Sequence, residues 1–146
     1  MITVEIANRS GADVDESEAG ELARRLLAAE GIDEAELGLA FVGSDEMRTL
    51  KRDHLGLDET TDVLSFPLEE PGILGDVVVS IDTARRQAKE GGWPLAAELR
   101  RLLAHGILHC RGYDHESAAD ARRMAAAERK LLGRTGMVGA SLSGVE

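Results

Sequence analysis

The sequence is poor in cysteine and aromatic residues, has fewer basic than acidic side chains, and contains no long hydrophobic run. Its single cysteine, Cys110, excludes an intramolecular disulfide framework and is typical of a reducing compartment. No apolar stretch approaches the roughly 18 residues of a membrane span, and the first residues, MITVEIANRSG, show no secretory signal. These absences predict a cytoplasmic protein that is not bound to a membrane.

Several common ligand-binding patterns are missing as well. The sequence has neither a GxGxxG motif after a strand nor a GxxxxGKS or GxxxxGKT motif, which argues against a dinucleotide or nucleoside triphosphate site. Aromatic residues make up 3% of the chain, too few for an aromatic stacking platform to dominate nucleic-acid binding.

The overall composition is nevertheless that of a folded domain. The 146 residues are 43% apolar and 30% charged, which suits one hydrophobic core and excludes a disordered or fibrous chain. We expect one domain over residues 1–133 and a flexible C-terminal tail over residues 134–146, which are rich in glycine and serine.

Hydrophobic periodicity predicts four strands and five helices. The expected strands are residues 1–7, 37–42, 63–66 and 76–81, with Pro67 ending the third and a turn-rich connection over 69–75. Strand 76–81 is the most continuously apolar and is expected to be central. The expected helices are residues 16–30, 44–54 with Ser44 as N-cap, 82–90, 95–110 and 117–132. This order predicts an α+β domain with a small mixed four-stranded sheet and about five helices, gathered late in the chain.

Three of the four histidines lie within eleven residues, HGILHCRGYDH, at His105, His109 and His115. His105 and His109 are four residues apart in a predicted helix, so their Cβ atoms lie about 5 to 6 Å apart on one face. Gly112 can end the helix in the left-handed conformation and turn the chain so that His115 supplies a third nitrogen. The pattern predicts a three-histidine metal site with an open position, the arrangement of a catalytic zinc ion.

Residues around the histidines offer further candidate roles. A catalytic zinc ion lowers the pKa of its bound water to about 7, although three imidazoles also suit nickel, copper or iron. Asp114 and Glu116 flank His115, and either is placed to orient a ligand imidazole or to receive a proton; helix capping is an equal alternative for Asp114. Cys110 points about 100° away from His109 around the helix, so we interpret it as a small, half-buried apolar residue.

The histidine spacing is shared with metzincin proteases, whose pattern is HExxHxxGxxH. In that pattern the glutamate after the first histidine is the general base. Gly106 occupies this position here, so a peptide-cleaving mechanism lacks its proton acceptor.

The chain also resembles the YbeY family, bacterial single-strand-specific endoribonucleases of ribosomal RNA (rRNA) maturation, including 16S rRNA 3′ end processing, and ribosome quality control. HGILHCRGYDH is similar to that family's HGxLHxxGYDH signature, and TDVLSFP (61–67) followed by GDVVVS (75–80) is similar to its strand pair. The resemblance covers about residues 4–132. It implies a small α+β fold, one zinc ion on His105, His109 and His115, a single-stranded rRNA precursor as substrate, and the ribosome or small-subunit proteins as partners.

The loop before TDVLSFP departs from the family pattern. Many members have a Tyr-Arg pair and a proline there, and the arginine serves catalysis or RNA contact; this chain has His54, Leu55 and Thr60 at those places. Arg52, three residues before Leu55, is placed to supply the cation from the same helical face, with a solvated helix residue as the alternative. His54 is interpreted as a packed or solvent-edge residue.

The main hypothesis is zinc-assisted hydrolysis of an RNA phosphodiester, in which the zinc polarises a phosphoryl oxygen or supplies hydroxide. Asp114 or Glu116 would move the proton, and an arginine such as Arg52 would offset developing charge. One alternative is a ribosome-assembly factor whose zinc is mainly structural, favoured by the missing loop arginine. The other is a metal-dependent hydrolase of another substrate, including peptides, which Gly106 disfavours.

The formal net charge of -10 argues at first against nucleic acid, but it is unevenly distributed. Residues 1–84 carry 6 basic and 20 acidic side chains, whereas residues 85–134 carry 11 basic and 6 acidic ones. The basic excess lies on the helices expected to frame the metal. It predicts an RNA-facing surface whose binding weakens as salt rises, although solvated charges on helices are an equally ordinary explanation.

Overall fold

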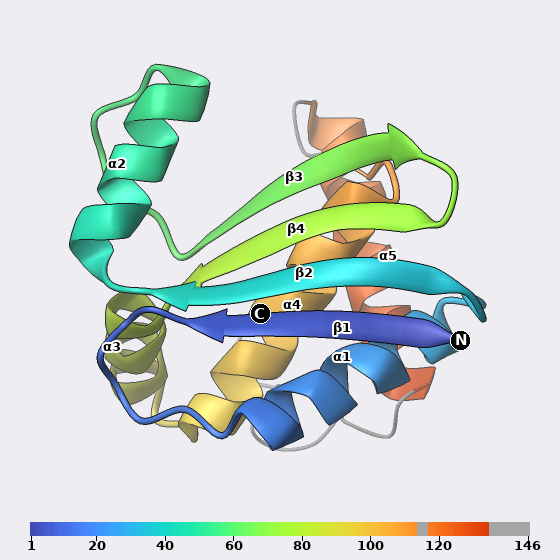
Figure 1. Cartoon of the computed structure of the whole chain (residues 1–146), viewed down its shortest axis with the longest axis horizontal. Helices are drawn as coiled ribbons and strands as arrows, with labels where there is room; N and C mark the ends of the chain where they lie inside the picture. Colours follow the sequence, from blue (N-terminus) through green and yellow to red (C-terminus); the bar gives the residue numbers. More distant parts are fainter. Residues whose placement is uncertain (114–116, 135–146) are drawn as a thin grey trace.

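The computed structural model describes residues 1–113 and 117–134, which form an α+β fold with a mixed four-stranded sheet and five helices (Figure 1). The strands are β1 (Ile2–Asn8), β2 (Ala35–Val42), β3 (Val63–Glu70) and β4 (Ile73–Ser80). The helices are α1 (Glu16–Ala29), α2 (Ser44–Leu55), α3 (Ile81–Gly91), α4 (Leu95–Cys110) and α5 (Ala118–Arg134). The predicted fold class and order of elements are confirmed. Over these described residues, no helix has the length and apolar character that a membrane crossing requires.

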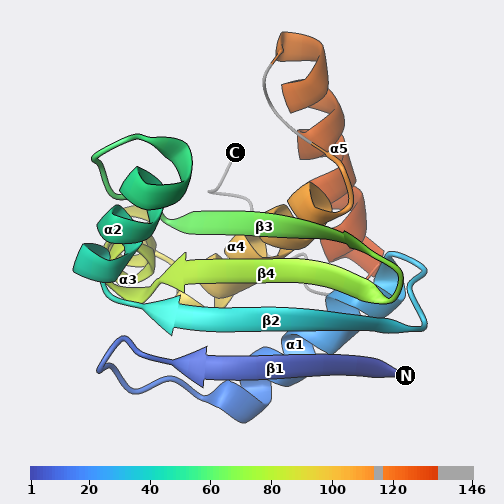
Figure 2. The ribbon, with the colours of Figure 1, turned by 45° about the horizontal axis from the view of Figure 1, so that its top comes forward.

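The sheet has the strand order β1-β2-β4-β3, with β1, β2 and β4 parallel and β3 antiparallel to β4. The strand predicted to be central, β4, lies between β2 and β3. Leu39 of β2 pairs with Ile6 of β1 and with Val77 of β4, so apolar side chains line up across one face. Figures 1 and 2 show α1, α4 and α5 behind the sheet and α2 at one end of it.

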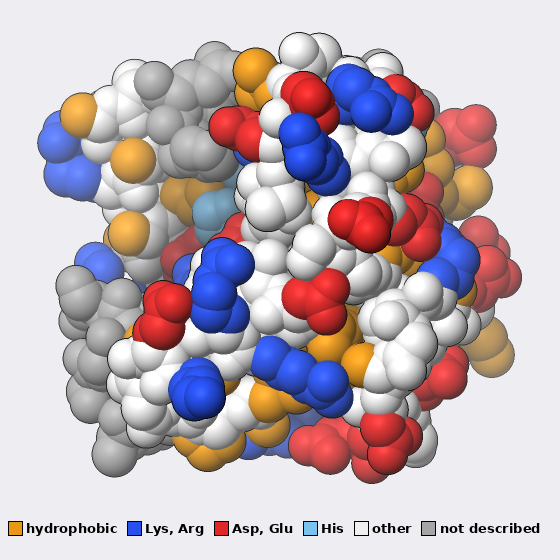
Figure 3. Space-filling model, turned by 90° about the vertical axis from the view of Figure 1, so that its left-hand side faces the viewer, with side chains coloured by type: hydrophobic (Ala, Val, Ile, Leu, Met, Phe, Trp, Pro, Cys, Tyr) orange, Lys and Arg blue, Asp and Glu red, His pale blue; other side chains and the backbone are white. Residues whose placement is uncertain are grey.

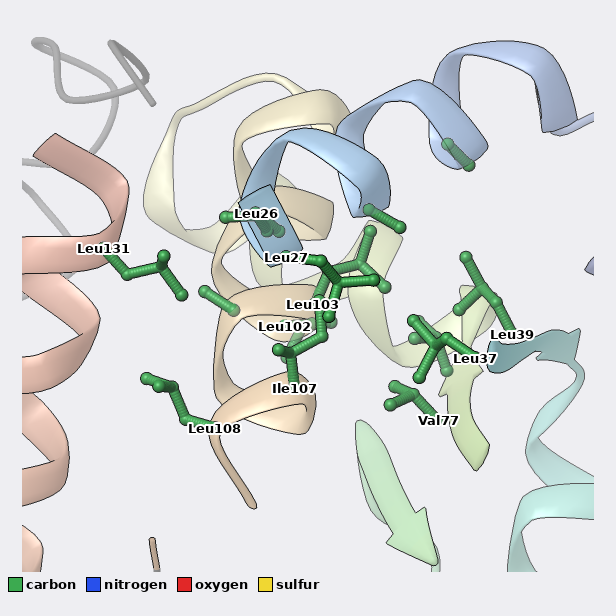
Figure 4. Packing of buried hydrophobic residues seen from close by; sticks show 14 of the residues in the cluster. Leu26, Leu27, Leu37, Leu39, Val77, Leu102, Leu103, Ile107, Leu108 and Leu131 are labelled. Atoms are coloured by element: carbon green, nitrogen blue, oxygen red, sulfur yellow. The ribbon is translucent and has the colours of Figure 1, made fainter. Parts of the chain in front are cut away.

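Helix α4 is held in the core on two sides. Figure 4 shows Leu103 and Ile107 on the side of α4 toward Val77, and Leu108 on the side toward Leu131 of α5. All five side chains are almost completely buried in one cluster. Burial of each such side chain contributes about 1.5–3 kcal/mol. These contacts fix the rotation of α4 about its axis, and so determine where its polar side chains point.

Strand β3 is longer than predicted. It does not end at Pro67 but continues to Glu70, and most of the expected turn-rich connection forms the paired ends of β3 and β4. Pro67 is tolerated because β3 is an edge strand, where a missing N–H need not break a ladder. Its partner Gly75 has a φ of 142°, and a Cβ there would lie 2.4 Å from the carbonyl oxygen of Phe66.

The start of α2 differs from prediction by one residue. Gly43 is the N-cap, and Ser44 is the first helical residue. The backbone N–H and the hydroxyl of Ser44 both donate to Oδ2 of Asp82 at 2.9 Å. These two hydrogen bonds, the backbone one first, hold the pKa of the Asp82 carboxyl below its ordinary value. A carboxylate from α3 therefore caps α2 in place of a local side chain.

Candidate active site

A cleft of about 430 Å³ opens between α4 and β3 and extends to the end of α2. This volume lies within the range of ligand sites in proteins. On the face seen in Figure 3, histidine side chains (pale blue) are visible at the bottom of a hollow, and lysine and arginine side chains (blue) lie on several sides of it. Helix α2, residues 61–65 and helix α4 contribute the lining side chains, which include Lys51, Leu55, Asp62, Ser65, Arg101, His105 and His109.

Three polar side chains of α4 form a row along the cleft. Arg101, His105 and His109 are spaced by four residues and all line it. The rings of His105 and His109 lie with centroids 4.8 Å apart and planes at 71°. The structure thus brings two of the three predicted metal ligands side by side, because core packing turns this face of α4 toward β3.

The remaining residues predicted around the metal, Asp114, His115 and Glu116, lie outside the described residues. In the part of the chain that is described, no group of three His, Cys, Asp or Glu side chains is placed to hold a metal ion. The His105 and His109 pair itself fits a transition metal, because two imidazoles one helical turn apart in an accessible cleft are a suitable donor set. The three-histidine site stays a prediction.

A carboxylate from α5 contacts the first histidine. Oε1 of Glu128 lies 2.5 Å from Nδ1 of His105, and both side chains are largely buried. Sequence reasoning gave the role of orienting an imidazole to Asp114 or Glu116 and overlooked Glu128. A usable signal was present, because Glu128 interrupts the buried stripe of Met124 and Leu131 on α5.

Gly106 faces the sheet and not the cleft. A Cβ at this position would lie 2.6 Å from Cγ1 of Val77 and 3.2 Å from Oγ of Ser65. The Ser65 hydroxyl donates to the carbonyl oxygen of Gly106 at 3.0 Å, joining β3 to α4 beside the histidines. A glutamate after His105 would therefore collide with the sheet, so this fold has no room for the general base of the metzincin pattern.

Cys110 is half-buried and packs against the main core, as predicted. Burial, aided by the nearby Asp76 carboxylate and opposed by a hydrogen bond with Ser65, raises the pKa of its thiol to about 11. The thiol therefore stays protonated at neutral pH. It is therefore not a thiolate nucleophile at that pH.

The cations of the cleft differ from the predicted one. Arg52 is exposed, with Nε 3.4 Å from Oδ1 of Asp53, and it is not among the residues that line the cleft. Lys51 of α2 and Arg101 of α4 line it instead, and Leu55 occupies the position of the family's loop arginine. Lys51 and Arg52 are neighbours in α2, so their side chains point about 100° apart around the helix axis. The sequence alone does not determine which of the two faces the cleft.

Behind Arg101 lies a carboxylate that sequence reasoning also overlooked. Glu98 is completely buried and accepts three hydrogen bonds: from Nη2 of Arg101 at 2.5 Å, Nε2 of Gln87 at 2.7 Å and Nε1 of Trp93 at 2.9 Å. Arg101 also lies 3.7 Å from Oδ2 of Asp62. Glu98 therefore joins α3, α4 and their connection at one end of the cleft.

The protein has an α+β fold with a mixed four-stranded sheet, and two histidines of the buried helix α4 line a cleft beside that sheet. This combination defines the class of protein as an α+β protein with a candidate transition-metal site. The family model described as endoribonuclease YbeY matches residues 5–136 of this chain. The chain belongs to the endoribonuclease YbeY family.

Individual relatives agree with the family match. An endoribonuclease YbeY of Anaeromyxobacter dehalogenans (strain 2CP-C) is 52% identical over 124 residues, 82% of this chain and 64% of the relative. One of Syntrophotalea carbinolica is 44% identical over 123 residues, 78% of this chain and 82% of the relative. The solution structure of TM1509 from Thermotoga maritima superposes with a TM-score of 0.58 at 28% identity, covering 91% of this chain and 90% of that one. The chain spans less than two thirds of the Anaeromyxobacter relative and 50% of a Myxococcus xanthus relative.

Proposed function

We propose that this protein is a zinc-dependent endoribonuclease that hydrolyses phosphodiesters of single-stranded RNA in the cleft beside α4. The observation that carries the proposal is the row of Arg101, His105 and His109, which joins a cation and the two imidazoles predicted to bind a metal in one cleft. The family match supports an RNA substrate. The particular substrate in this proposal is an rRNA precursor, including the 16S rRNA 3′ end. In this proposal the enzyme acts in the cytoplasm, with the ribosome or small-subunit proteins as partners.

His105, His109 and His115 would hold the zinc ion, which supplies Lewis-acid chemistry when bound. Arg101 would contact the phosphate, because a guanidinium carries five donors and its contact with Glu98 uses only Nη2. Lys51 of α2, whose Nζ lies 2.9 Å from Oε1 of Glu59, would add positive charge to the cleft. These two cations take the role that the sequence suggested for Arg52.

Proton transfer would fall to Asp114 or Glu116, the carboxylates next to His115 in the sequence. Glu128 would not serve here, because its carboxylate is already engaged with His105. Ser65 would not act as a nucleophile, because its hydroxyl donates to the Gly106 carbonyl oxygen.

The test combines metal analysis with cleavage of a defined single-stranded RNA by the purified full chain, with and without chelator. His109→Ala is expected to lose both zinc and cleavage. His54→Ala is the matched control, because this exposed histidine contacts Phe66 and does not line the cleft. It should keep both properties. Full cleavage by metal-free protein, or equal cleavage of duplex RNA, would contradict the proposal, and digestion of casein would favour the peptidase alternative.

A second candidate, a ribosome-assembly factor with a structural zinc ion, is favoured by Leu55, which places an apolar side chain in the cleft wall. Zinc-loaded protein carrying Arg101→Lys, which keeps a positive charge beside the buried Glu98, would separate the two functions in cells depleted of the native protein. Normal rRNA maturation by a variant that has lost most of its cleavage activity would support assembly. Parallel loss of cleavage and maturation would support the nuclease.

A further inference from the structure

The contact between α5 and the first histidine of the cleft goes beyond the predicted metal ligands. Glu128 lies on the face of α5 that carries the buried residues Met124 and Leu131, so packing of α5 on α4 fixes its position. Its Oε1 lies 2.5 Å from Nδ1 of His105, and the Glu128 side chain is only 21% exposed. The carboxylate is therefore held against the imidazole by the core and not by a flexible surface contact.

This contact determines which nitrogen of His105 can bind a cation. An ionised carboxylate is only an acceptor, so the contact requires a proton on Nδ1. A neutral imidazole has one donor and one acceptor nitrogen, so Nε2 then carries the lone pair. Because the His105 ring lines the cleft, Nε2 is the nitrogen with which it would bind a metal ion there.

We propose that Glu128 is a positioning residue for the metal site: it holds His105 in the Nδ1–H tautomer and strengthens Nε2 as a ligand for a divalent transition metal. The proposal rests on the proposed function only in taking His105 as a metal ligand. A carboxylate that accepts from a ligand imidazole typically raises metal affinity about 10- to 100-fold. For His105, Glu128 supplies an orienting contact of the kind that the sequence suggested for Asp114 or Glu116.

The experiment measures zinc affinity of the full chain by competition with a chromophoric chelator. Glu128→Gln keeps the size of the side chain and removes its charge, and it should bind zinc roughly 10- to 100-fold more weakly. Glu128→Asp, which keeps the charge but shortens the reach, should fall between Gln and the native residue. Glu21→Gln changes an exposed helical carboxylate on α1 and should leave affinity unchanged. Zinc binding by Glu128→Gln within twofold of the native protein would overturn the proposal.

A second measurement needs no variant. Long-range proton–nitrogen NMR of the metal-free native protein should find His105 protonated at Nδ1, and a proton on Nε2 alone would overturn the proposal even if Glu128→Gln failed to fold. RNA cleavage is measured in parallel. Native protein that binds zinc but cleaves no RNA would refute the proposed function and leave the role of Glu128 standing, whereas native protein that binds no zinc would overturn both.

Discussion

Two carboxylates contact the cleft-facing row of α4, and they differ in burial and in partners. Glu98 contacts Arg101 at one end of the row, and Glu128 contacts His105 at its middle. Glu98 is completely buried, lies three residues before Arg101 on the same helix, and accepts from three donors that include a guanidinium. Glu128 is 21% exposed, comes from α5, and contacts an imidazole that is neutral when it binds a metal. Arg101 is therefore held by a buried ion pair, and His105 by a contact with a partly exposed carboxylate.

Glu98 and Glu128 are therefore expected to affect different properties of the protein, the first its folding stability and the second its metal affinity. A buried carboxylate with a guanidinium and two neutral donors is strongly coupled to folding, because loss of one partner leaves the other desolvated and unpaired. A partly exposed carboxylate that makes one hydrogen bond with an imidazole contributes little to folding but alters the strength of that imidazole as a metal ligand. We therefore expect substitutions at Glu98 to change stability and those at Glu128 to change metal affinity.

The largest effect is expected from Glu98→Ala, which should lower the free energy of unfolding by about 3–5 kcal/mol because Arg101 loses its buried counter-charge. Glu128→Ala should lower it by only about 1 kcal/mol. Urea denaturation of the two metal-free variants and the native protein measures both values. Equal losses at the two positions would contradict the comparison.

The second largest effect on stability is expected at Gly106, where α4 packs against the sheet next to His105. Gly106→Ala introduces a Cβ 2.6 Å from Cγ1 of Val77, so the helix must shift, at a cost of about 1–3 kcal/mol. Zinc affinity should fall with it because His105 moves. Gly20→Ala is the control, since its nearest neighbour, Ile6 Cδ1 at 3.1 Å, is the end of a flexible side chain. The two variants should differ in thermal midpoint, and matched midpoints would count against tight packing at Gly106.

A smaller effect, on activity, tests the cation at the other end. Arg101→Lys keeps the charge beside Glu98 but loses the planar fork, and it should lower kcat/KM for single-stranded RNA about tenfold with unchanged zinc affinity. Arg86→Lys is the control, because Arg86 is exposed on α3 and does not line the cleft. RNA binding by the native protein should also weaken as salt rises. Equal cleavage by both variants would remove Arg101 from the substrate contacts.

The smallest effect concerns Asp82, an exposed carboxylate that serves as a contrast to Glu98 and Glu128. Hydrogen bonds from Ser44 lower the pKa of Asp82 from its ordinary value of 3.8 in the folded state. Its contribution to stability is therefore full above that ordinary pKa and disappears as the pH falls through the lowered folded-state pKa. Asp82→Asn should lower the free energy of unfolding by about 0.5–1 kcal/mol at pH 7. Denaturation between pH 2 and 7 should show this difference shrinking with acid, and a constant difference would exclude titration of Asp82.

Local pattern was sufficient for most of the fold. Apolar periodicity located the nine elements that the described residues form, and a continuously apolar segment identified β4 as an interior strand. Period and composition give this information because they reflect which faces lie against a core. The end of β3 was missed because proline disfavours a strand only where its N–H is needed, and that depends on β3 being an edge strand. The N-cap of α2 was misplaced because its capping carboxylate, Asp82, comes from another helix.

The same division holds for the candidate site. The sequence by itself determined that His105 and His109 share a face of α4 and that Cys110 does not, because helix geometry depends only on spacing. Only the tertiary structure decided that Lys51 and Arg101 line the cleft while Arg52 does not. It alone also decided that Glu128 of α5 contacts His105 and that Glu98 is buried against Arg101. These relations depend on how helices rotate and pack against one another. That arrangement is the outcome of burying the whole core and is not encoded in any single segment.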